Sequence, residues 1–452
     1  MSNKKIYFQV LVLMVVFTSC SKSYNTPQKP ENQPVYWHAP SKGYVLESVE
    51  GTNKLYGVSA AGNVLIDANV LPENYANLMF TEEGDQLVGT SDLFIDKVYF
   101  YKLTDTTTVF DSTSIDFSVD PKINAEHFWN LFNDYYAFFD LRGVNWEANL
   151  SLLPTVTSEN LYPVLQQMVQ PLNDFHIGIF NQEVNITSGE ARILEHMNAH
   201  LTAELQSKTF PELLAAIRSR VPIIHSKYLD DTFNSDPNGN MFWGLVTDEI
   251  GYFNIANMGG YAPVEDEITA VNHVMDQVMN DIQQANIDKI IIDLRFNGGG
   301  FDGIALEIAS RFTSISRPIF TIKSKSRTGF IEEQAITINP KGDYQFFGEI
   351  VLLTSPFTAS AAEIFVLSLK DLPNVTIVGE HTMGIFSSIL THRLPNGTYI
   401  NLSNQVYTDT FGTVFEGIGI GPAQENMVPF LSTEDFNTGL DSGIEKGVTI
   451  LE

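Results

Sequence analysis

Apolar residues follow a helical spacing in some parts of the chain and form short runs in others. Between Asn124 and Phe139, apolar and aromatic residues recur three and four positions apart, at Phe128, Leu131, Phe132, Tyr135 and Phe138 or Phe139. This spacing predicts an amphipathic helix whose aromatic face packs into a core rather than binding a ligand. Similar patterns predict helices over residues 158–169, 192–220, 265–284, 304–312 and 361–370.

Two kinds of strand pattern surround these helices. From Tyr36 to about Val119, short β-like runs such as YVLESVE and DKVYFYKLTD are separated by turn residues, which is typical of a small all-β domain. Farther along, the nearly continuous apolar runs IGYFNIA, KIIIDLRF, EIVLLT and TIVGE alternate with the helices. This alternation predicts an α/β layer around a partly parallel sheet.

The patterns divide the chain into five regions. Residues 1–20 form a leader, 21–35 a polar and Pro-rich tether, 36–119 the β domain, 120–240 a mainly helical part, and 241–452 the α/β part. The predicted fold class is therefore α/β, or α+β when the β domain is included.

Composition narrows the possible partners. The 452 residues include 54 acidic and 26 basic side chains, which gives a formal net charge of -28, and 44% of the residues are hydrophobic. Such a chain folds into a globular protein and repels a phosphate backbone. Nucleic acid is excluded as a partner.

The leader predicts export. A basic start, MSNKK, precedes an apolar run from Ile6 to Phe17, which is too short to span a bilayer, and then Thr18-Ser19-Cys20. This order resembles a bacterial lipoprotein signal, in which the cysteine becomes the lipidated first residue; an ordinary secretory signal is the alternative. The resemblance implies a membrane-anchored protein of the cell envelope, held through Cys20. Since Cys20 is the only cysteine, no intrachain disulfide can form.

The first segment with candidate chemistry is a strand that runs into three glycines, KIIIDLRFNGGGFDG. Consecutive glycines allow backbone N–H groups to converge on a small anionic target, such as an oxyanion or a phosphate. The segment lacks the G-x-G-x-x-G spacing of dinucleotide folds and the Gly-Lys-Ser/Thr of a P-loop, so a nucleotide site is excluded.

The second segment, EIVLLTSPFTASAAEIFVLSLKD, leads from an apolar strand into a helix. Ser360 stands at the start of that helix, where free N–H groups favour negative charge. Taken alone, Ser360 and Glu363 also fit a capping box, in which each side chain bonds the backbone of the other. Both a nucleophile and a helix cap are compatible with this segment.

Together the two segments resemble the tail-specific (C-terminal processing) serine peptidase family. The family's Asp-x-Arg-x-Asn-x-Gly-Gly strand stands here at 293–300, and its Thr-Ala-Ser-Ala-x-Glu turn at 358–363. Similar segments are VGEHTMG at 378–384, EGIGIGP at 416–422 and YYAFFDLRGVNW at 135–146. The resemblance implies a ClpP/crotonase-like α/β core, Ser360 as nucleophile, and the backbone N–H groups of Gly299 and Ala361 as the oxyanion hole.

One departure affects the mechanism. Family members with a Ser-Lys dyad carry a lysine where this chain has Ile385, and isoleucine cannot accept a proton. Tricorn-like members instead carry an Asp-x-His, which here is similar to Asp174-Phe175-His176, and an orienting acid at the position of Glu416. Imidazole suits the task because its pKa lies near neutral pH. Asp174 is the rival orienting acid.

The resemblance implies hydrolysis of peptide bonds in polypeptides or short peptides, with no cofactor and no metal. Glu195, His196 and His200 lack the order of a His-Glu-x-x-His zinc motif, and we read them as a solvated helix face. Two other functions stay open: an inactive relative that binds peptides or small apolar ligands, and an acyl hydrolase that acts on other substrates.

Overall fold

The structure is a computed structural model, and it describes residues 33–49, 52–68, 79–105, 110, 117–189, 208–229, 232–263, 266–430 and 432–452. Cys20, residues 21–32 of the predicted tether, and the Glu195, His196 and His200 group lie outside these residues, as does most of the segment 192–220. The predicted tether ends at residue 35, whereas β1 already begins at Val35. Helices and strands both contribute substantially, and the mixed α and β class predicted from the sequence is confirmed.

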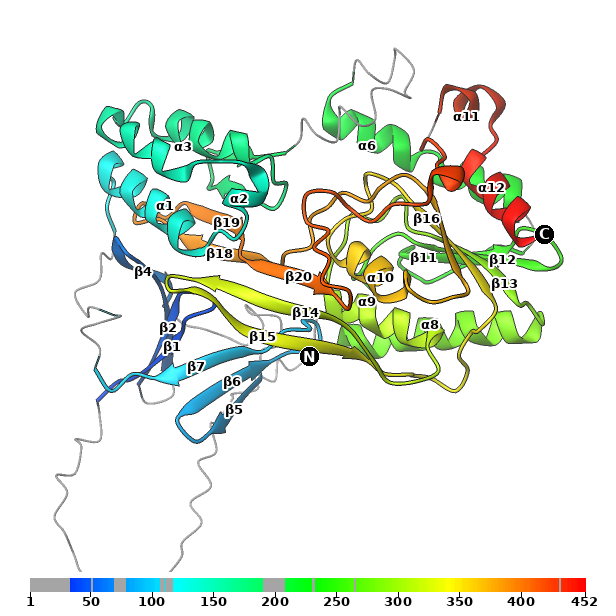
Figure 1. Cartoon of the computed structure of the whole chain (residues 1–452), viewed down its shortest axis with the longest axis horizontal. Coiled ribbons are helices and arrows are strands. Elements are labelled where there is room, and N and C mark those ends of the chain that lie inside the picture. Colours follow the sequence, from blue (N-terminus) through cyan, green and yellow to red (C-terminus); the bar gives the residue numbers. More distant parts are fainter. Residues whose placement is uncertain are drawn as a thin grey trace, which may run out of the picture.

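An antiparallel sheet forms the N-terminal part (Figure 1). Its strands are β1 (Val35–Ala39), β2 (Tyr44–Val49), β3 (Thr52–Ser59), β4 (Gly62–Asp67), β5 (Met79–Glu83), β6 (Gln86–Thr90) and β7 (Val98–Lys102). They pair in the order β4-β3-β2-β1-β7-β6-β5. The sheet therefore lies where the short β-like runs predicted strands.

A helical layer follows. It contains α1 (Pro121–Tyr135), α2 (Phe139–Arg142) and α3 (Leu161–Val169), with single 3₁₀ turns at 146–151, 153–155 and 170–172. The aromatic face of α1 is buried with α3 in one cluster, as its spacing predicted. The helix ends at Tyr135 rather than at the predicted Phe139, because the backbone at residues 136–138 is not helical. The predicted helix over 158–169 starts at Leu161, because residues 158–160 form a turn. Past this layer, α6 (Phe210–Arg218), α7 (Val221–Ile224) and a π-helical turn (His225–Leu229) lead into the α/β part.

The α/β part is built on a six-stranded sheet. Its order is β10 (Asn234–Ser235), β11 (Met241–Leu245), β12 (Ile250–Ile255), β13 (Lys289–Asp293), β16 (Glu349–Thr354) and β17 (Val375–Gly379), with the last four strands parallel. One face packs against α8 (Glu267–Gln284), α9 (Asp302–Ala309) and α10 (Ala361–Leu369), and the other against α12 (Ser442–Leu451). Helices on both faces explain why these strands are continuously apolar.

Two smaller sheets connect these parts. The long hairpin of β14 (Arg317–Ser326) and β15 (Gly329–Ile338) pairs with β20 (Gln405–Asp409) and crosses the middle of the molecule in Figure 1. The other sheet has the order β18 (Ile389–Arg393), β19 (Tyr399–Ser403), β8 (Gly178–Phe180) and β9 (Asn185–Thr187). Because β8 pairs with β19, the structure joins the regions that the sequence analysis separated at residue 240. The helices α11 (Thr433–Thr438) and α12 complete the chain.

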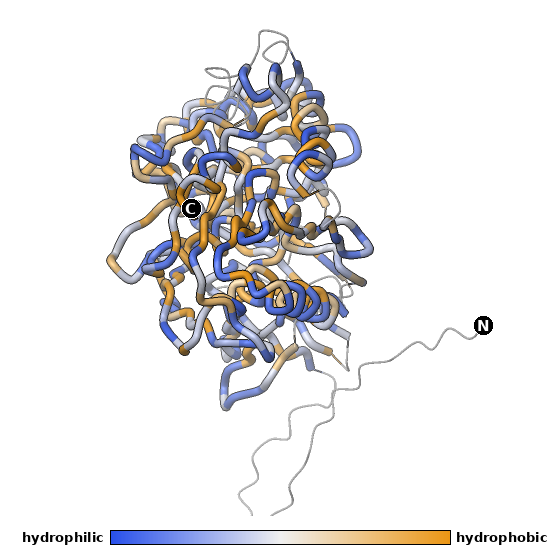
Figure 2. Tube along the Cα trace, turned by 90° about the vertical axis from the view of Figure 1, so that its right-hand side faces the viewer, coloured by the Kyte–Doolittle hydropathy of each residue, from blue (hydrophilic) through white to orange (hydrophobic). Residues whose placement is uncertain are grey.

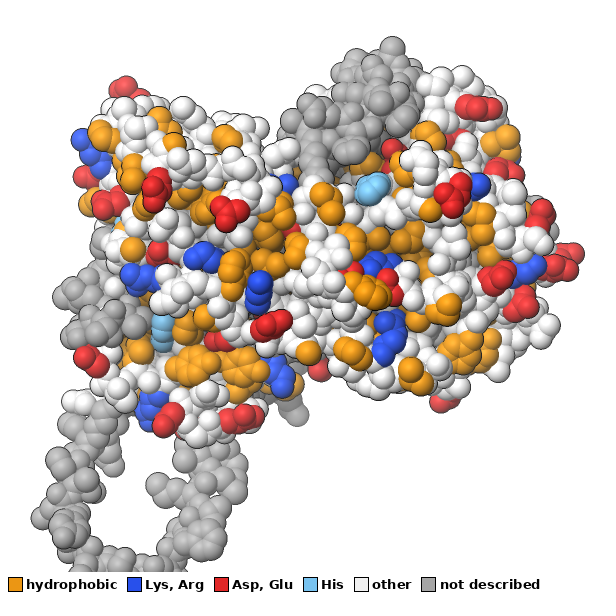
Figure 3. Space-filling model, viewed as in Figure 1, with side chains coloured by type: hydrophobic (Ala, Val, Ile, Leu, Met, Phe, Trp, Pro, Cys, Tyr) orange, Lys and Arg blue, Asp and Glu red, His pale blue; other side chains and the backbone are white. Residues whose placement is uncertain are grey.

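Figure 2 shows polar and apolar stretches interleaved along the trace. Among the described residues, no helix has both the length and the apolar character needed to cross a membrane. On the face drawn in Figure 3, acidic and basic side chains are interspersed rather than gathered into a basic stripe.

Candidate active site

Ser360 lies in a sharp turn between β16 and α10. Its backbone has φ 54° and ψ -122°, a region that non-glycine residues rarely adopt. Neighbouring backbone holds the turn: Ser355 Oγ donates to the Arg295 carbonyl (2.7 Å) and Thr358 Oγ1 to the Leu294 carbonyl (2.9 Å). Ser360 therefore stands at the first turn of a buried helix, and the surrounding hydrogen bonds maintain its unusual backbone conformation.

The glycine segment lies directly against this serine. Gly299 has φ +106°, and a Cβ on it would lie 2.8 Å from both Ser360 Cβ and the Ala359 carbonyl oxygen. Only glycine fits there without a shift of the nucleophile turn. The two segments singled out in the sequence, more than fifty positions apart, are therefore brought together.

The oxyanion donors differ from those expected. The Gly299 N–H donates to Asn297 Oδ1 at 2.8 Å, so this group is already engaged. The Ala361 N–H, in the first turn of α10, has no acceptor among the described residues, and the same holds for the N–H of the exposed Gly298. The predicted role of Gly299 as a donor is therefore not supported. What Gly299 supplies is room for Ser360.

From the sequence, Glu363 was expected only to cap the helix that follows Ser360. Its buried carboxylate accepts hydrogen bonds from the N–H of Ser360 (3.1 Å), Gly384 (2.7 Å) and Ile385 (2.8 Å), and from Thr382 Oγ1 (2.6 Å). Burial raises the pKa of Glu363 to about 7, against the effect of these donors. Glu363 therefore ties the nucleophile turn to the segment 382–385.

Ile385, at the position of the dyad lysine, leaves no base there. Ile385 is buried and its N–H is bound by Glu363. Lys370, the nearest lysine along the chain, forms ion pairs with Asp371 (2.8 Å) and Asp409 (2.9 Å) at the far end of α10. The structure offers neither residue as a base for Ser360.

His176 lies in the loop between the turn at 170–172 and β8. Its backbone N–H donates to Asp174 Oδ1 (3.0 Å), and its side chain is buried with Nδ1 lacking a partner. Burial lowers the pKa of His176, while Asp174 and the backbone of Ser387 oppose the shift. The contact with Ser387 involves its carbonyl, because only an acceptor favours the protonated ring. A neutral imidazole at neutral pH is the form that can accept a proton.

The two candidate orienting acids are both engaged elsewhere. Glu416 Oε1 accepts from Arg142 Nη2 (3.1 Å), and Oε2 accepts from the N–H of Phe386 (2.8 Å) and Ser387 (3.2 Å). Burial and the nearby carboxylates of Asp174 and Glu363 raise the pKa of Glu416, and Arg142 opposes them.

Asp174 uses Oδ1 for the His176 N–H and Oδ2 for the Tyr136 hydroxyl (3.0 Å). Neither acid is hydrogen-bonded to the imidazole ring, but Asp174 is the carboxylate that raises the pKa of His176.

A short backbone segment links the serine and histidine sides. The N–H of Ile385 reaches the Glu363 that also holds Ser360, and two residues later Ser387 contacts both Glu416 and His176. Residues 385–387 therefore fix the spacing between the two halves of the site.

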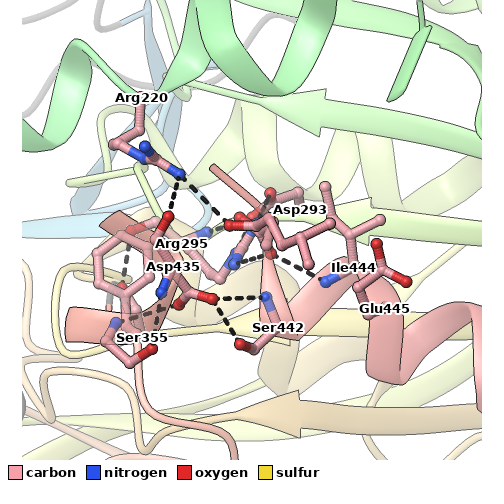
Figure 4. A network of polar contacts seen from close by, with 12 residues as sticks. Arg220, Asp293, Arg295, Ser355, Asp435, Ser442, Ile444 and Glu445 are labelled. Carbon is pink, nitrogen blue, oxygen red and sulfur yellow. Dashed lines mark hydrogen bonds and ion pairs between the residues drawn. The ribbon is translucent and has the colours of Figure 1, made fainter. Parts of the chain in front are cut away.

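A buried network of polar contacts surrounds Arg295, three residues before the glycine segment (Figure 4). Arg295 donates from Nη2 to Asp293 Oδ2 (2.6 Å) and from Nη1 to Asp441 Oδ1 (2.8 Å). Tyr252 also donates to Asp293 (2.7 Å). The strand end that carries the glycines is thereby tied to the start of α12. In the described part of the chain, no group of three or more metal-ligating side chains comes together.

A serine set on a strained strand-to-helix turn beside a glycine segment is an arrangement that hydrolases with a serine nucleophile use. The family follows from the sequence: residues 249–425 match Peptidase family S41. Over these residues the chain is similar to that family, and the resemblance predicted from the sequence is confirmed there.

Curated relatives agree with this assignment. The chain is 27% identical over 206 residues to the tricorn protease of Thermoplasma volcanium, covering 45% of this chain and 17% of that protein. It is 25% identical over 182 residues to the carboxyl-terminal-processing protease of Picosynechococcus sp., covering 40% of each. The chain spans less than half the length of these relatives.

Solved structures show the same fold. A candidate peptidase from Parabacteroides merdae matches with a TM-score of 0.59 at 21% identity, over 74% of this chain and 96% of that one. Mature CPAF matches with a TM-score of 0.53 at 13% identity, over 74% of this chain and 96% of that one. At 74% of this chain, the likeness extends well beyond residues 249–425.

Proposed function

We propose that this chain is a serine peptidase that hydrolyses peptide bonds through an acyl-enzyme on Ser360. The observation that carries the proposal is the placement of Ser360: a positive-φ turn, pressed against Gly299, at the head of a helix whose first N–H is free. That arrangement exposes a hydroxyl and leaves donors for an oxyanion. The match of residues 249–425 to Peptidase family S41 supports the same reaction.

His176 is the base in the proposed mechanism. It removes the Ser360 proton while Ser360 Oγ attacks the peptide carbonyl, and the N–H groups of Ala361 and Gly298 stabilise the oxyanion. Imidazolium then protonates the leaving amine, and water releases the acyl group by the reverse proton transfers. Residues 385–387 connect the two halves through the contacts of Ile385 with Glu363 and of Ser387 with Glu416 and His176. Glu416 keeps its predicted role as orienting acid. To bond the His176 imidazole, its carboxylate has to give up the hydrogen bond that it accepts from Arg142.

A fluorophosphonate probe tests the reaction directly. We expect covalent labelling of the purified protein, with the adduct on Ser360 by intact-mass and peptide analysis, and none in Ser360→Ala. Labelling of another serine would reject Ser360 as the nucleophile. No labelling, together with tight binding of an uncleaved peptide, would replace the peptidase by a binding protein. Parallel peptide and ester panels distinguish a peptidase from another acyl hydrolase.

We also propose that the chain is exported and anchored to a membrane of the bacterial cell envelope through lipid on Cys20. The leader supports this: MSNKK, the apolar run 6–17 and a cysteine preceded by Thr18 and Ser19. One acyl-bearing residue would hold the domain at the surface, with residues 21–35 as tether. In the Cys20→Ala variant we expect loss of lipid labelling and release from the membrane fraction; unchanged partitioning rejects the anchor.

A further inference from the structure

The N-terminal sheet touches the candidate active site at two points through one loop. This loop, residues 92–96 between β6 and β7, is called the brace below. Its first contact is with the start of α9, directly after the glycine segment: Gly303 N–H donates to the Leu93 carbonyl (3.0 Å), and Ile95 N–H donates to Asp302 Oδ1 (3.2 Å). Phe94 packs edge-on against Phe301, with ring centroids 5.8 Å apart.

The fit at this contact is close. A Cβ on Gly303 would lie 2.2 Å from the Asp92 carbonyl oxygen. Only glycine at this position therefore lets the brace pack directly against the start of the helix that follows Gly298, Gly299 and Gly300.

The second contact leads to the histidine side. Asp96 Oδ2 accepts from Gln405 Nε2 (2.7 Å) and from Lys42 Nζ (2.9 Å). Gln405 in turn donates its backbone N–H to Ser387 Oγ (3.0 Å). Gln405 and Ser387 are fully buried and Asp96 nearly so, so water cannot replace these bonds at low cost.

Ser387 is the residue through which these contacts reach the proposed catalytic groups. Its N–H donates to Glu416, and its carbonyl interacts with the His176 imidazole. Fixing the Ser387 side chain therefore fixes the backbone atoms that face both groups.

We infer that the brace makes the N-terminal sheet a working part of the active site, with Asp96 and Gln405 as positioning residues that act on His176 through Ser387. The inference rests on the proposed peptidase function. The sheet contributes no atom to the reaction; it sets the position of the Ser387 carbonyl against the imidazole on one side and the start of α9 on the other. The domain is thus more than a spacer between a membrane anchor and a peptidase.

The test compares two contacts of the same sheet. Asp96→Ala removes the acceptor of Gln405, whereas the control Gln334→Ala removes an equally direct contact between the N-terminal sheet and β15, in which Gln334 bonds both backbone groups of Lys97. The control contact does not lead to Ser387. Asp96→Asn is the conservative variant, because its amide oxygen can still accept from Gln405.

The primary readout is the pKa of His176 from an NMR titration of its ring protons, assigned with a His176→Gln variant. Loss of the Ser387 carbonyl contact should lower this pKa in Asp96→Ala, leave it unchanged in Gln334→Ala, and return it toward the original value in Asp96→Asn. With a cleavable peptide, we expect Asp96→Ala to reduce kcat on the order of 10²-fold with little change in KM.

Equal His176 pKa values in Asp96→Ala and Gln334→Ala, at equal melting temperatures, would overturn the inference and leave the sheet as a scaffold. The NMR readout does not require turnover. If fluorophosphonate does not label the protein but the pKa of His176 still changes in Asp96→Ala, the peptidase proposal would be rejected. The inference about the brace would stand.

Discussion

Arg142 donates to Glu416 at 3.1 Å, and both side chains are almost completely shielded from solvent. This pair takes one oxygen of the acid that sequence resemblance assigns to His176, and the backbone of Phe386 and Ser387 takes the other. Breaking a buried hydrogen-bonded pair of ionisable side chains is costly, because one partner is then left without its bond. The orientation of His176 is therefore the point at which mutagenesis is most informative.

Exchange of each acid for its amide separates their roles. If Glu416 orients His176 during turnover, Glu416→Gln should lower kcat by up to about 10⁴-fold, as loss of tautomer control does in a serine protease triad. Asp174→Asn should instead lower the pKa of His176, because Asp174 is the carboxylate that raises it. Steady-state kinetics of both purified variants across pH distinguishes the two effects. A larger loss of kcat in Asp174→Asn would make Asp174 the orienting acid.

The pH dependence of the reaction should report an imidazole. Burial lowers the pKa of His176 from the usual 6.5, so kcat/KM should hold through pH 6.5 and fall only at more acidic pH, as the ring becomes protonated. The measurement is kcat/KM for one peptide from pH 4 to 10. Activity that instead appears only as a group well above neutral loses its proton would indicate a lysine and exclude His176.

Adjacent glycines should respond differently to alanine. At Gly299 the added Cβ meets Ser360 Cβ at 2.8 Å and the backbone has φ +106°, so Gly299→Ala should cost about 1–3 kcal/mol and displace the nucleophile. Gly298 has no atom within 4 Å of the same position, and Gly298→Ala should keep its melting temperature. Thermal unfolding of the pair, with fluorophosphonate labelling rates, makes the comparison. Equal stability of both variants would contradict the packing described.

Acid should weaken the docking of the N-terminal sheet. Burial lowers the pKa of His392 to about 4, and its Nε2 lies 2.8 Å from the Lys42 carbonyl of that sheet. A folded-state pKa below 6.5 means that the neutral ring stabilises the fold above pH 6.5, and that this stability, roughly 3 kcal/mol, is lost as pH falls from 6.5 to about 4.

Urea unfolding of His392→Gln and of a control at the exposed His273 measures this effect. The His392→Gln curve should depend less on pH between 6.5 and 4, while the His273→Gln curve should follow the original protein. Parallel curves for all three would assign the acid sensitivity to other groups.

Short-range sequence patterns predicted the helices and strands that have a buried apolar face or that follow a sharp turn. The apolar strands that became β12, β13, β16 and β17 and the helix starting after Ser360 were visible because burial on both faces leaves continuous apolar runs. Glu363 was read only as a cap, since its other donors, Thr382, Gly384 and Ile385, approach through the fold rather than along the chain. The pairing of β8 with β19 was missed for the same reason.

That pairing has a consequence for the order of folding. Gly178, two residues after His176, is opposite Asn401 in the sheet, so the histidine loop finds its register only when almost the whole chain is present. Contacts between such distant positions form late, because closing the intervening loop costs entropy before any bond repays it. We expect the serine turn to be structured while His176 is still undocked. If Ser360 and His176 act as proposed, a chain still being synthesised would carry its nucleophile without its base, and would be inactive until folding is complete.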